Sequence, residues 1–228
     1  MIFNIPAGGK KKVLCSFLGA VGETFTVEQK GVVLRTGLAE GETLELKQGE
    51  YQVTGSLSAY RKTVAVKSAG AYGVYPDGAI YWYGREVYPM TTSLNQGYSS
   101  AAATENTNDI DLYAWANSNV AATSSMAQTI TQDLVDTAGY SAIRYEVTVE
   151  SIYEKYSGGA AQINLGHRTT TGYTALTNAV LTAVSDKQTY SVTAPTEPAY
   201  IGVQAYAGWG GNTGNYYARA YVHAIWME

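Results

Sequence analysis

The chain has 228 residues and a mass of 24.4 kDa, with 15 Lys and Arg residues against 19 Asp and Glu and a formal charge of −4. With 15% charged and 46% hydrophobic residues it is too apolar for a disordered protein. Its longest uncharged apolar run, Val13–Gly22, is too short to cross a bilayer. A pI near 5.3 argues against a nucleic-acid-binding protein. We therefore expect neither a nucleic-acid partner nor membrane insertion.

The composition changes near residue 70. Residues 1–70 carry 9 basic and 6 acidic residues, whereas residues 71–228 carry 6 basic and 13 acidic residues, together with all four Trp and 18 of the 20 Tyr. A shift of this kind marks a boundary between domains. We predict a spacing or docking domain over residues 1–70 and a binding domain over residues 71–228.

Residues 1–70 read as a run of short strands. Period-two segments such as Glu42–Leu46 alternate with turn signals at a spacing of about eight to twelve residues, which is typical of an antiparallel sandwich. The segment Leu46–Val53 resembles an edge of immunoglobulin-like and PEGA-type modules. We predict a small immunoglobulin-like sandwich in which Cys15 is a buried, unpaired thiol. Lys10–Lys12 before the apolar run mimics a secretion signal without a cleavage site. We expect an extracellular or virion-associated protein without a recognisable signal peptide.

Residues 71–228 show eight or nine further strand patterns and no sustained helical periodicity. Ala71–Gly84, with Pro76–Gly78 as its turn, is predicted to form a hairpin. The later strands are predicted at Ile110–Ala116, Met126–Ile130, Ile143–Ile152, Ala161–His167, Val180–Val184, Thr189–Thr193, Tyr200–Ala205 and Tyr216–Met227. This number of strands in about 150 residues is typical of a jelly roll. The sequence therefore predicts an all-β fold, a small immunoglobulin-like sandwich followed by a jelly-roll β-sandwich.

Alternation along these strands separates a core face from an outer face. Ile143, Tyr145, Val147 and Val149 are predicted to face the core, as are Ala218, Ala220, Val222, Ala224 and Trp226. Trp82 is also predicted to lie in the core. Whether Trp115 faces the core or the outer side is left undecided. The outer face then carries Arg, Gln, Asn, Glu, His and Tyr side chains. If the strands share one sheet, these form a wide surface of rings and planar hydrogen-bonding groups.

Such a surface suits a sugar, because hydroxyls bind amides, carboxylates and guanidinium groups while CH-rich ring faces stack on aromatic rings. The loop between Tyr206 and Tyr216 places Trp209 among four glycines and two asparagines, which favours an exposed ring. The alternative is the polar outer face that any antiparallel sandwich needs. The candidate ligand-binding residues are Trp209, Tyr206, Gln204, Tyr217, Arg219, Tyr221, Asn164 and Arg168.

Catalytic and metal-binding patterns are weak. His167 and His223 have no nucleophile partner in local sequence, and the acidic residues form no obvious glycosidase pair. Glu105–Asp111 is rich in oxygen ligands but lacks the features of a calcium loop, so an Asx-rich turn is favoured and a structural calcium is left open. We expect no enzymatic activity, no catalytic residues, no cofactor and no metal site.

Three segments of the chain resemble parts of a known group of proteins. Gly78–Gly84, Asp133–Ser141 and Val222–Glu228 resemble parts of modular tail or minor structural proteins of phages and prophages, in which an immunoglobulin-like module precedes a jelly roll similar to carbohydrate-binding modules. The resemblance implies attachment to a virion or host surface. We expect a non-enzymatic adhesion module that recognises a cell-surface carbohydrate, with other virion or surface proteins as partners. The alternatives are a structural virion subunit whose aromatic face is a homo-oligomer interface and, third, a polysaccharide hydrolase.

Overall fold

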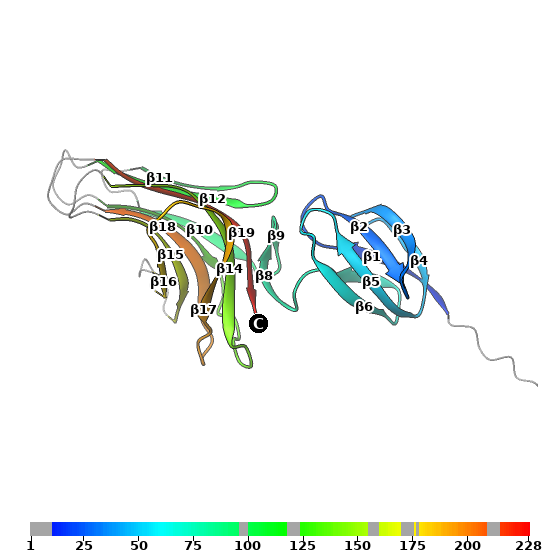
Figure 1. The fold of residues 1–228 in the computed structure, drawn as a ribbon. Helices are drawn as coiled ribbons and strands as arrows, with labels where there is room; N and C mark the ends of the chain where they lie inside the picture. Colours follow the sequence, from blue (N-terminus) through cyan, green and yellow to red (C-terminus); the bar gives the residue numbers. More distant parts are fainter. Residues whose placement is uncertain are drawn as a thin grey trace, which may run out of the picture. The chain divides into compact units, whose positions relative to one another are not determined.

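A computed structural model describes residues 11–95, 100–117, 124–154, 160–169, 176, 178–208 and 215–228. The chain divides into two compact units, Met1–Pro76 and Asp77–Glu228 (Figure 1). The described residues form strands and turns with no helix, which confirms the predicted all-β class. Among them there is accordingly no apolar helix of the length that a bilayer crossing requires.

The first unit is a sandwich of two sheets. Its strands are β1 (Lys12–Leu18), β2 (Thr24–Gln29), β3 (Val32–Ala39), β4 (Leu44–Lys47), β5 (Gly49–Gly55), β6 (Arg61–Val66) and β7 (Gly70–Gly73). One sheet has the order β4-β1-β7 and the other β3-β2-β5-β6. Its core contains the fully buried side chains of Phe17, Phe25, Leu38 and Val53. Cys15 is also buried there and forms no disulfide.

The unit boundary lies six residues after the predicted one. β7 pairs in parallel with β1, through Cys15↔Gly70 to Leu18↔Gly73, so residues 70–76 belong to the first unit. The predicted hairpin over Ala71–Gly84 is therefore wrong. Its Pro76-Asp77-Gly78 turn marks the passage between units, and the second half of the segment pairs with the C-terminal strand.

The second unit is a larger sandwich (Figure 1). Its strands are β8 (Gly78–Trp82), β9 (Arg85–Glu86), β10 (Met90–Asn95), β11 (Ser100–Glu105), β12 (Ile110–Asn117), β13 (Ser124–Thr131), β14 (Ala142–Glu154), β15 (Ala160–Arg168), β16 (Ala179–Leu181), β17 (Ser185–Thr193), β18 (Tyr200–Gly208) and β19 (Asn215–Met227). The five-stranded sheet has the order β10-β13-β18-β15-β16. The seven-stranded sheet has the order β11-β12-β19-β14-β17, with β8 on β19 and β9 on β8.

The core lies between these two sheets. Ile143, Tyr145 and Val147 from the seven-stranded sheet pack in one cluster with residues of the five-stranded sheet such as Ile163 and Val203, and all of them are fully buried. Tyr145 donates its hydroxyl to the carbonyl of Gly166 at 2.8 Å, which joins the sheets by a hydrogen bond. Burial raises the pKa of Tyr145 well above its usual value. The predicted inward face of β14 is thus confirmed.

Trp226 departs from the predicted alternation. The pairing of β19 with β14 shifts register between Val222 and Ala224, where His223 is an extra residue, so Ile225 and Met227 turn into the core and Trp226 turns outward, half-buried. There its ring meets Trp82 edge-on at a centroid distance of 5.8 Å. A β-bulge reverses side-chain parity beyond it, which strict period-two counting does not anticipate. Trp82 itself is buried.

Candidate ligand-binding site

The outer side of the seven-stranded sheet presents a polar and aromatic surface. β12, β19 and β14 are neighbours there, and their alternate side chains point away from the core. We call this surface the open face. It consists of Asp111, Tyr113 and Trp115 on β12, Tyr217, Arg219 and Tyr221 on β19, and Glu150 and Tyr153 on β14. The face is open to solvent, since the Arg219 and Glu150 side chains are 37% and 43% exposed.

Three aromatic residues lie in one row across the open face. Trp115 is directly opposite Tyr217, and Tyr217 is directly opposite Tyr153. The Tyr153 and Tyr217 rings stack with centroids 5.1 Å apart and planes inclined by 14°. Tyr153 is 41% exposed. This aromatic row (Trp115, Tyr217 and Tyr153) offers the stacking surface that a sugar ring needs.

A charged network lies beside the aromatic row. Arg219 donates to both carboxylate oxygens of Asp111, at 2.9 and 2.6 Å, and its third nitrogen lies 3.0 Å from Glu150 Oε2. Its guanidinium group also lies 5.2 Å from the ring centre of Tyr221. The hydrogen bond from Arg219 to Asp111 is the main reason that the pKa of this guanidinium is raised. The network fixes Arg219 in place, because a bidentate pair constrains both groups.

A bulge in β14 brings Glu150 into this network. Val149 pairs with Ala220 and Ser151 with Arg219, so Glu150 is an extra residue without a partner in the strand register. Its carboxylate accepts a hydrogen bond from the Tyr221 hydroxyl at 3.0 Å. Desolvation, followed by this hydrogen bond, raises the pKa of Tyr221. The carboxylate therefore joins Arg219 to Tyr221, and all three groups are presented on one surface.

His223 occupies the next outward position on β19. Its Nε2 lies 2.9 Å from Thr148 Oγ1, and its Nδ1 lies 3.9 Å from Asp109 Oδ2. A hydroxyl, an imidazole and a carboxylate in this order resemble a hydrolytic triad. The 3.9 Å between His223 and Asp109 is longer than a hydrogen bond, however, so Asp109 does not orient the ring as the acid of a triad would. Burial is the main cause of the lowered pKa of His223. We assign this group no catalytic role.

The other outer face of the sandwich carries a different polar row. Ser93, Gln128, Gln204 and Asn164 are directly opposite one another on β10, β13, β18 and β15, and we call them the amide row. Asn164 Nδ2 donates to Gln204 Oε1 at 2.8 Å, Gln204 Nε2 to Gln128 Oε1 at 3.5 Å, and Gln128 Nε2 to Ser93 Oγ at 2.6 Å. Asn164, Gln204 and Gln128 are only 0–2% exposed.

The predicted site residues therefore fall into two groups on opposite sides of the sandwich. Tyr217, Arg219 and Tyr221 lie on the open face, whereas Gln204, Asn164, Tyr206 and Arg168 lie on the five-stranded sheet. The expectation that all of them share one exposed surface is wrong, because β15 and β18 pair in a different sheet from β19. Gln204 and Asn164 are buried, and Tyr206 and Arg168 are half-buried. Trp209 lies outside the described residues.

Sequence reasoning missed part of the open face. Tyr153 lies one residue beyond the predicted strand end, and its pairing with Tyr217 could have been found by extending that strand. Trp115 shares parity with Asp111 and so lies on the same face. The sequence gives no signal for the bulge at Glu150, because nothing in that segment distinguishes a bulged residue from a paired one.

Metal-binding groups do not gather in the part of the chain that the structure describes, where no cluster of three or more His, Cys, Asp or Glu side chains could hold an ion. In the oxygen-rich segment, Asn106 donates through its backbone to the Asp109 carbonyl at 2.9 Å and through its side chain to the Asp109 carboxylate at 2.8 Å. These bonds close the turn between β11 and β12, which is rich in Asn and Asp as predicted.

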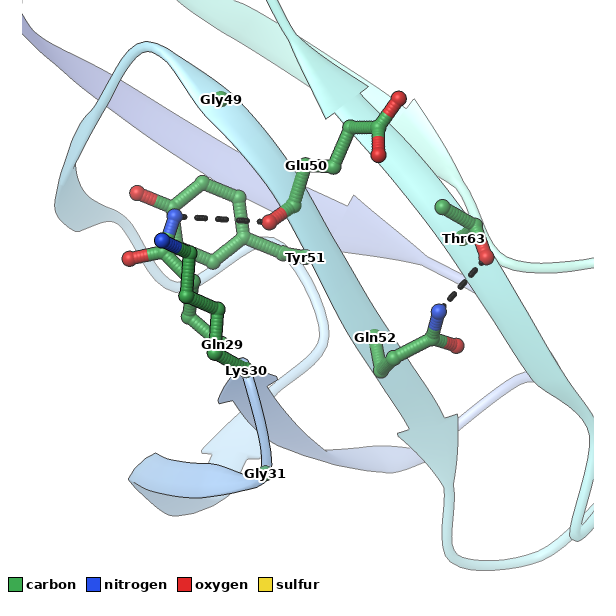
Figure 2. Close-up of a pocket in the computed structure, with 8 residues that line it drawn as sticks. All are labelled: Gln29, Lys30, Gly31, Gly49, Glu50, Tyr51, Gln52 and Thr63. Atoms are coloured by element: carbon green, nitrogen blue, oxygen red, sulfur yellow. Dashed lines mark hydrogen bonds between the residues drawn. The ribbon is translucent and has the colours of Figure 1, made fainter.

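The first unit has a hollow of its own, lined by residues of β2, β5, β6 and the β2–β3 turn (Figure 2). Gln29 donates there to the backbone carbonyl of Glu50 at 3.4 Å, and Gln52 donates to the hydroxyl of Thr63 at 2.7 Å (Figure 2). The amides that line this hollow are thus engaged with the protein itself. Lys30, at the β2–β3 turn with φ of 52°, lines the same hollow.

Comparisons with known proteins give distant structural likenesses. No protein-family model matches the chain. No curated protein matches its sequence. A solved structure described as one of the carbohydrate-binding modules from the β-sandwich superfamily is 14% identical, with a TM-score of 0.38 over 92% of this chain and 86% of that one. A family 29 carbohydrate-binding module from Piromyces equi is 14% identical, with a TM-score of 0.33 over 62% and 87%.

A third structure, a low-affinity xylan-binding module from Roseburia intestinalis, is 8% identical, with a TM-score of 0.30 over 60% of this chain and 96% of that one. Likenesses this distant do not say what the present chain binds. The assignment of a ligand must come from the geometry of its own surface.

Proposed function

We propose that this chain is a non-enzymatic binding module that holds a neutral glycan of a cell surface on the open face of its second unit. The observation that carries the proposal is the aromatic row, Trp115, Tyr217 and Tyr153, beside the fixed network of Asp111, Arg219 and Glu150. Rings contact the CH-rich faces of sugars, and the network supplies both donors and acceptors to hydroxyl groups.

The charge of the open face favours a neutral ligand over an acidic one. Asp111 and Glu150 contribute two carboxylates and Arg219 one guanidinium, whose donors both carboxylates already engage. An acidic sugar would meet this net negative surface without a free cationic partner among the described residues that make up the open face. A neutral sugar meets no such repulsion and can share the hydrogen-bonding atoms that remain exposed.

The test is a screen of neutral polysaccharides followed by isothermal titration calorimetry. Tyr217→Ala, which removes the centre of the aromatic row, should weaken binding about tenfold or more, which corresponds to roughly 1.4 kcal/mol. Tyr206→Ala is the matched control, because Tyr206 is a half-buried tyrosine on the five-stranded sheet. Loss of binding in Tyr206→Ala but not in Tyr217→Ala would move the site to the other face.

An interface between copies of this chain is the second candidate for the same surface. Tyr, Trp and Arg are enriched at protein interfaces, and Tyr153 leaves 41% of its surface exposed. Multi-angle light scattering separates the two functions. A dimer that Tyr217→Ala converts to monomer would favour the interface, whereas a monomeric wild type that binds glycan through Tyr217 would favour the binding module.

Attachment to a cell surface is the role that we infer for glycan binding, as the resemblance to phage tail proteins implied. Its support is that resemblance together with the open face. Cosedimentation of the fluorescently labelled chain with glycan-bearing cells measures attachment directly. The wild type should sediment with the cells and Tyr217→Ala should stay in the supernatant. Equal sedimentation of both would argue against attachment through this surface.

A further inference from the structure

Four lysines lie near one another at one end of the first unit. Lys11, Lys12 and Lys67 line a single hollow of about 420 Å³. Lys47 is directly opposite Lys12 in the antiparallel pairing of β1 and β4, so the two side chains share a face of the sheet. Like charges in directly opposed positions are destabilising. The fold therefore holds several cationic side chains close together.

The backbone that carries these lysines is held by specific hydrogen bonds. Gln48 donates its main-chain N–H to the Lys11 carbonyl at 3.0 Å and its side-chain amide to the Lys67 carbonyl at 2.6 Å. The Tyr51 hydroxyl donates to the Lys47 carbonyl at 2.6 Å. Gln48 thus ties two segments that are distant in sequence to one point, which sets their lysines around the same hollow.

The positive charge of this cluster is mostly unbalanced. Lys12 Nζ lies 2.7 Å from Glu45 Oε2. Lys11, Lys47 and Lys67 form no ion pair with any residue that the structure describes. Glu50 lines a neighbouring hollow together with Lys67. An anionic ligand would supply the countercharge that the protein itself does not.

We propose that this lysine hollow binds the anionic groups of an acidic polysaccharide. The side chains of Gln48 and Ser68, which line the hollow with the lysines, can engage sugar hydroxyls. No aromatic ring is among its lining residues, which disfavours the base stacking that single-stranded nucleic acid uses. The site lies in a different unit from the open face and does not depend on it.

Dextran sulfate and unmodified dextran provide the test, because the two polymers share a backbone and differ in their anionic groups. The full chain should bind dextran sulfate at low salt more tightly than dextran, and the difference in affinity between the two polymers measures the contribution of the lysine hollow. Lys11→Gln combined with Lys67→Gln should weaken binding about tenfold, given up to about fivefold for each exposed ion pair. The slope of log affinity against log salt should fall by about two, since two cationic contacts are removed.

Lys30→Gln is the matched control, an exposed lysine of the same unit that lines the other hollow (Figure 2). It should bind dextran sulfate within twofold of the wild type, and so should Tyr217→Ala. Polygalacturonate as a further ligand distinguishes carboxylate from sulfate groups. The proposal is overturned by an undetectable wild-type affinity for both acidic polymers, by equal losses in Lys30→Gln and the double variant, or by duplex DNA that binds as tightly with the same lysine dependence.

Discussion

The two outer faces of the second unit follow the same alternation of side chains, but only one of them is exposed to solvent. On the seven-stranded sheet, alternation brings Tyr217, Arg219 and Tyr221 to a surface that solvent reaches. On the five-stranded sheet, it brings Gln128, Gln204 and Asn164 to positions that are almost fully buried and bonded to one another. Parity tells which side of a sheet a residue occupies, and burial decides whether that side can meet a ligand.

Breaking the amide row should produce the largest effect on stability. Gln204→Met keeps the side-chain volume but removes the acceptor for Asn164 Nδ2 and the donor for Gln128 Oε1. Leaving a buried amide without its partner costs about 1–3 kcal/mol, so we expect a loss of about 2–3 kcal/mol in the free energy of unfolding. Urea unfolding followed by Trp fluorescence measures this in the second unit, which holds all four tryptophans. A loss below about 0.5 kcal/mol would contradict the proposed role of the row.

The corresponding change on the open face should cost less. Arg219→Gln removes two hydrogen bonds to Asp111, whose side chain is 15% exposed, while Arg219 itself is 37% exposed. Solvent screens such a pair, so we expect a loss of about 1 kcal/mol in the same unfolding experiment. If Arg219→Gln destabilises the unit more than Gln204→Met does, the distinction between a solvated and a buried face is wrong.

Lowering the pH should reduce stability by a smaller amount. Burial lowers the pKa of His223, against the raising effect of Asp109 and Glu146 and the lowering effect of Lys187. The unfolded state therefore binds a proton as the pH falls through about 6.5, while the folded state resists it. Stability should fall from pH 7.5 downward until the pH passes the lowered folded pKa, and then level off. Thr148 and Tyr83 are the neutral groups beside the ring.

His223→Gln should flatten this pH dependence in urea unfolding between pH 7.5 and 5. A residual slope should remain, because burial also lowers the pKa of His167. His167→Gln is the matched variant and should remove that remainder. A His223→Gln profile identical to that of the wild type would show that the ring is not protected from protonation in the folded state.

Removing the exposed ring of the aromatic row should have the smallest effect on stability. Tyr153 is 41% exposed and stacks on Tyr217, and aromatic pairs of this kind contribute about 0.5–1.5 kcal/mol when buried. At this exposure we expect Tyr153→Ala to cost about 0.5 kcal/mol of unfolding free energy. Glycan affinity should fall several-fold in the same variant. Destabilisation as large as that of Gln204→Met would mean that the row is a structural element.

The fold could be predicted where apolar alternation is regular. Ala218, Ala220 and Val222 were placed in the core by parity, and each is fully buried. β10 and β11 were missed, because segments such as Thr91-Thr92-Ser93 at the edges of the sheets carry little apolar alternation. Their pairing is fixed by neighbouring strands rather than by their own sequence pattern.

The candidate site could be predicted only in part, because residue chemistry does not specify which strands share a sheet. Tyr217 and Gln204 have the same outward parity, yet they lie on opposite sides of the sandwich. Register shifts at Glu150 and His223 depend on backbone pairing between distant segments. Long-range pairing of this kind leaves no local trace in a single sequence.

The most direct test of glycan binding at the open face is a calorimetric titration of one neutral polysaccharide into the wild type, Tyr217→Ala and Tyr206→Ala. The expected result is a saturable isotherm for the wild type and Tyr206→Ala, with an affinity at least about tenfold lower for Tyr217→Ala, which remains cooperatively folded at the temperature of the titration. Binding by Tyr217→Ala that equals that of the wild type would contradict the assignment of the open face as the site.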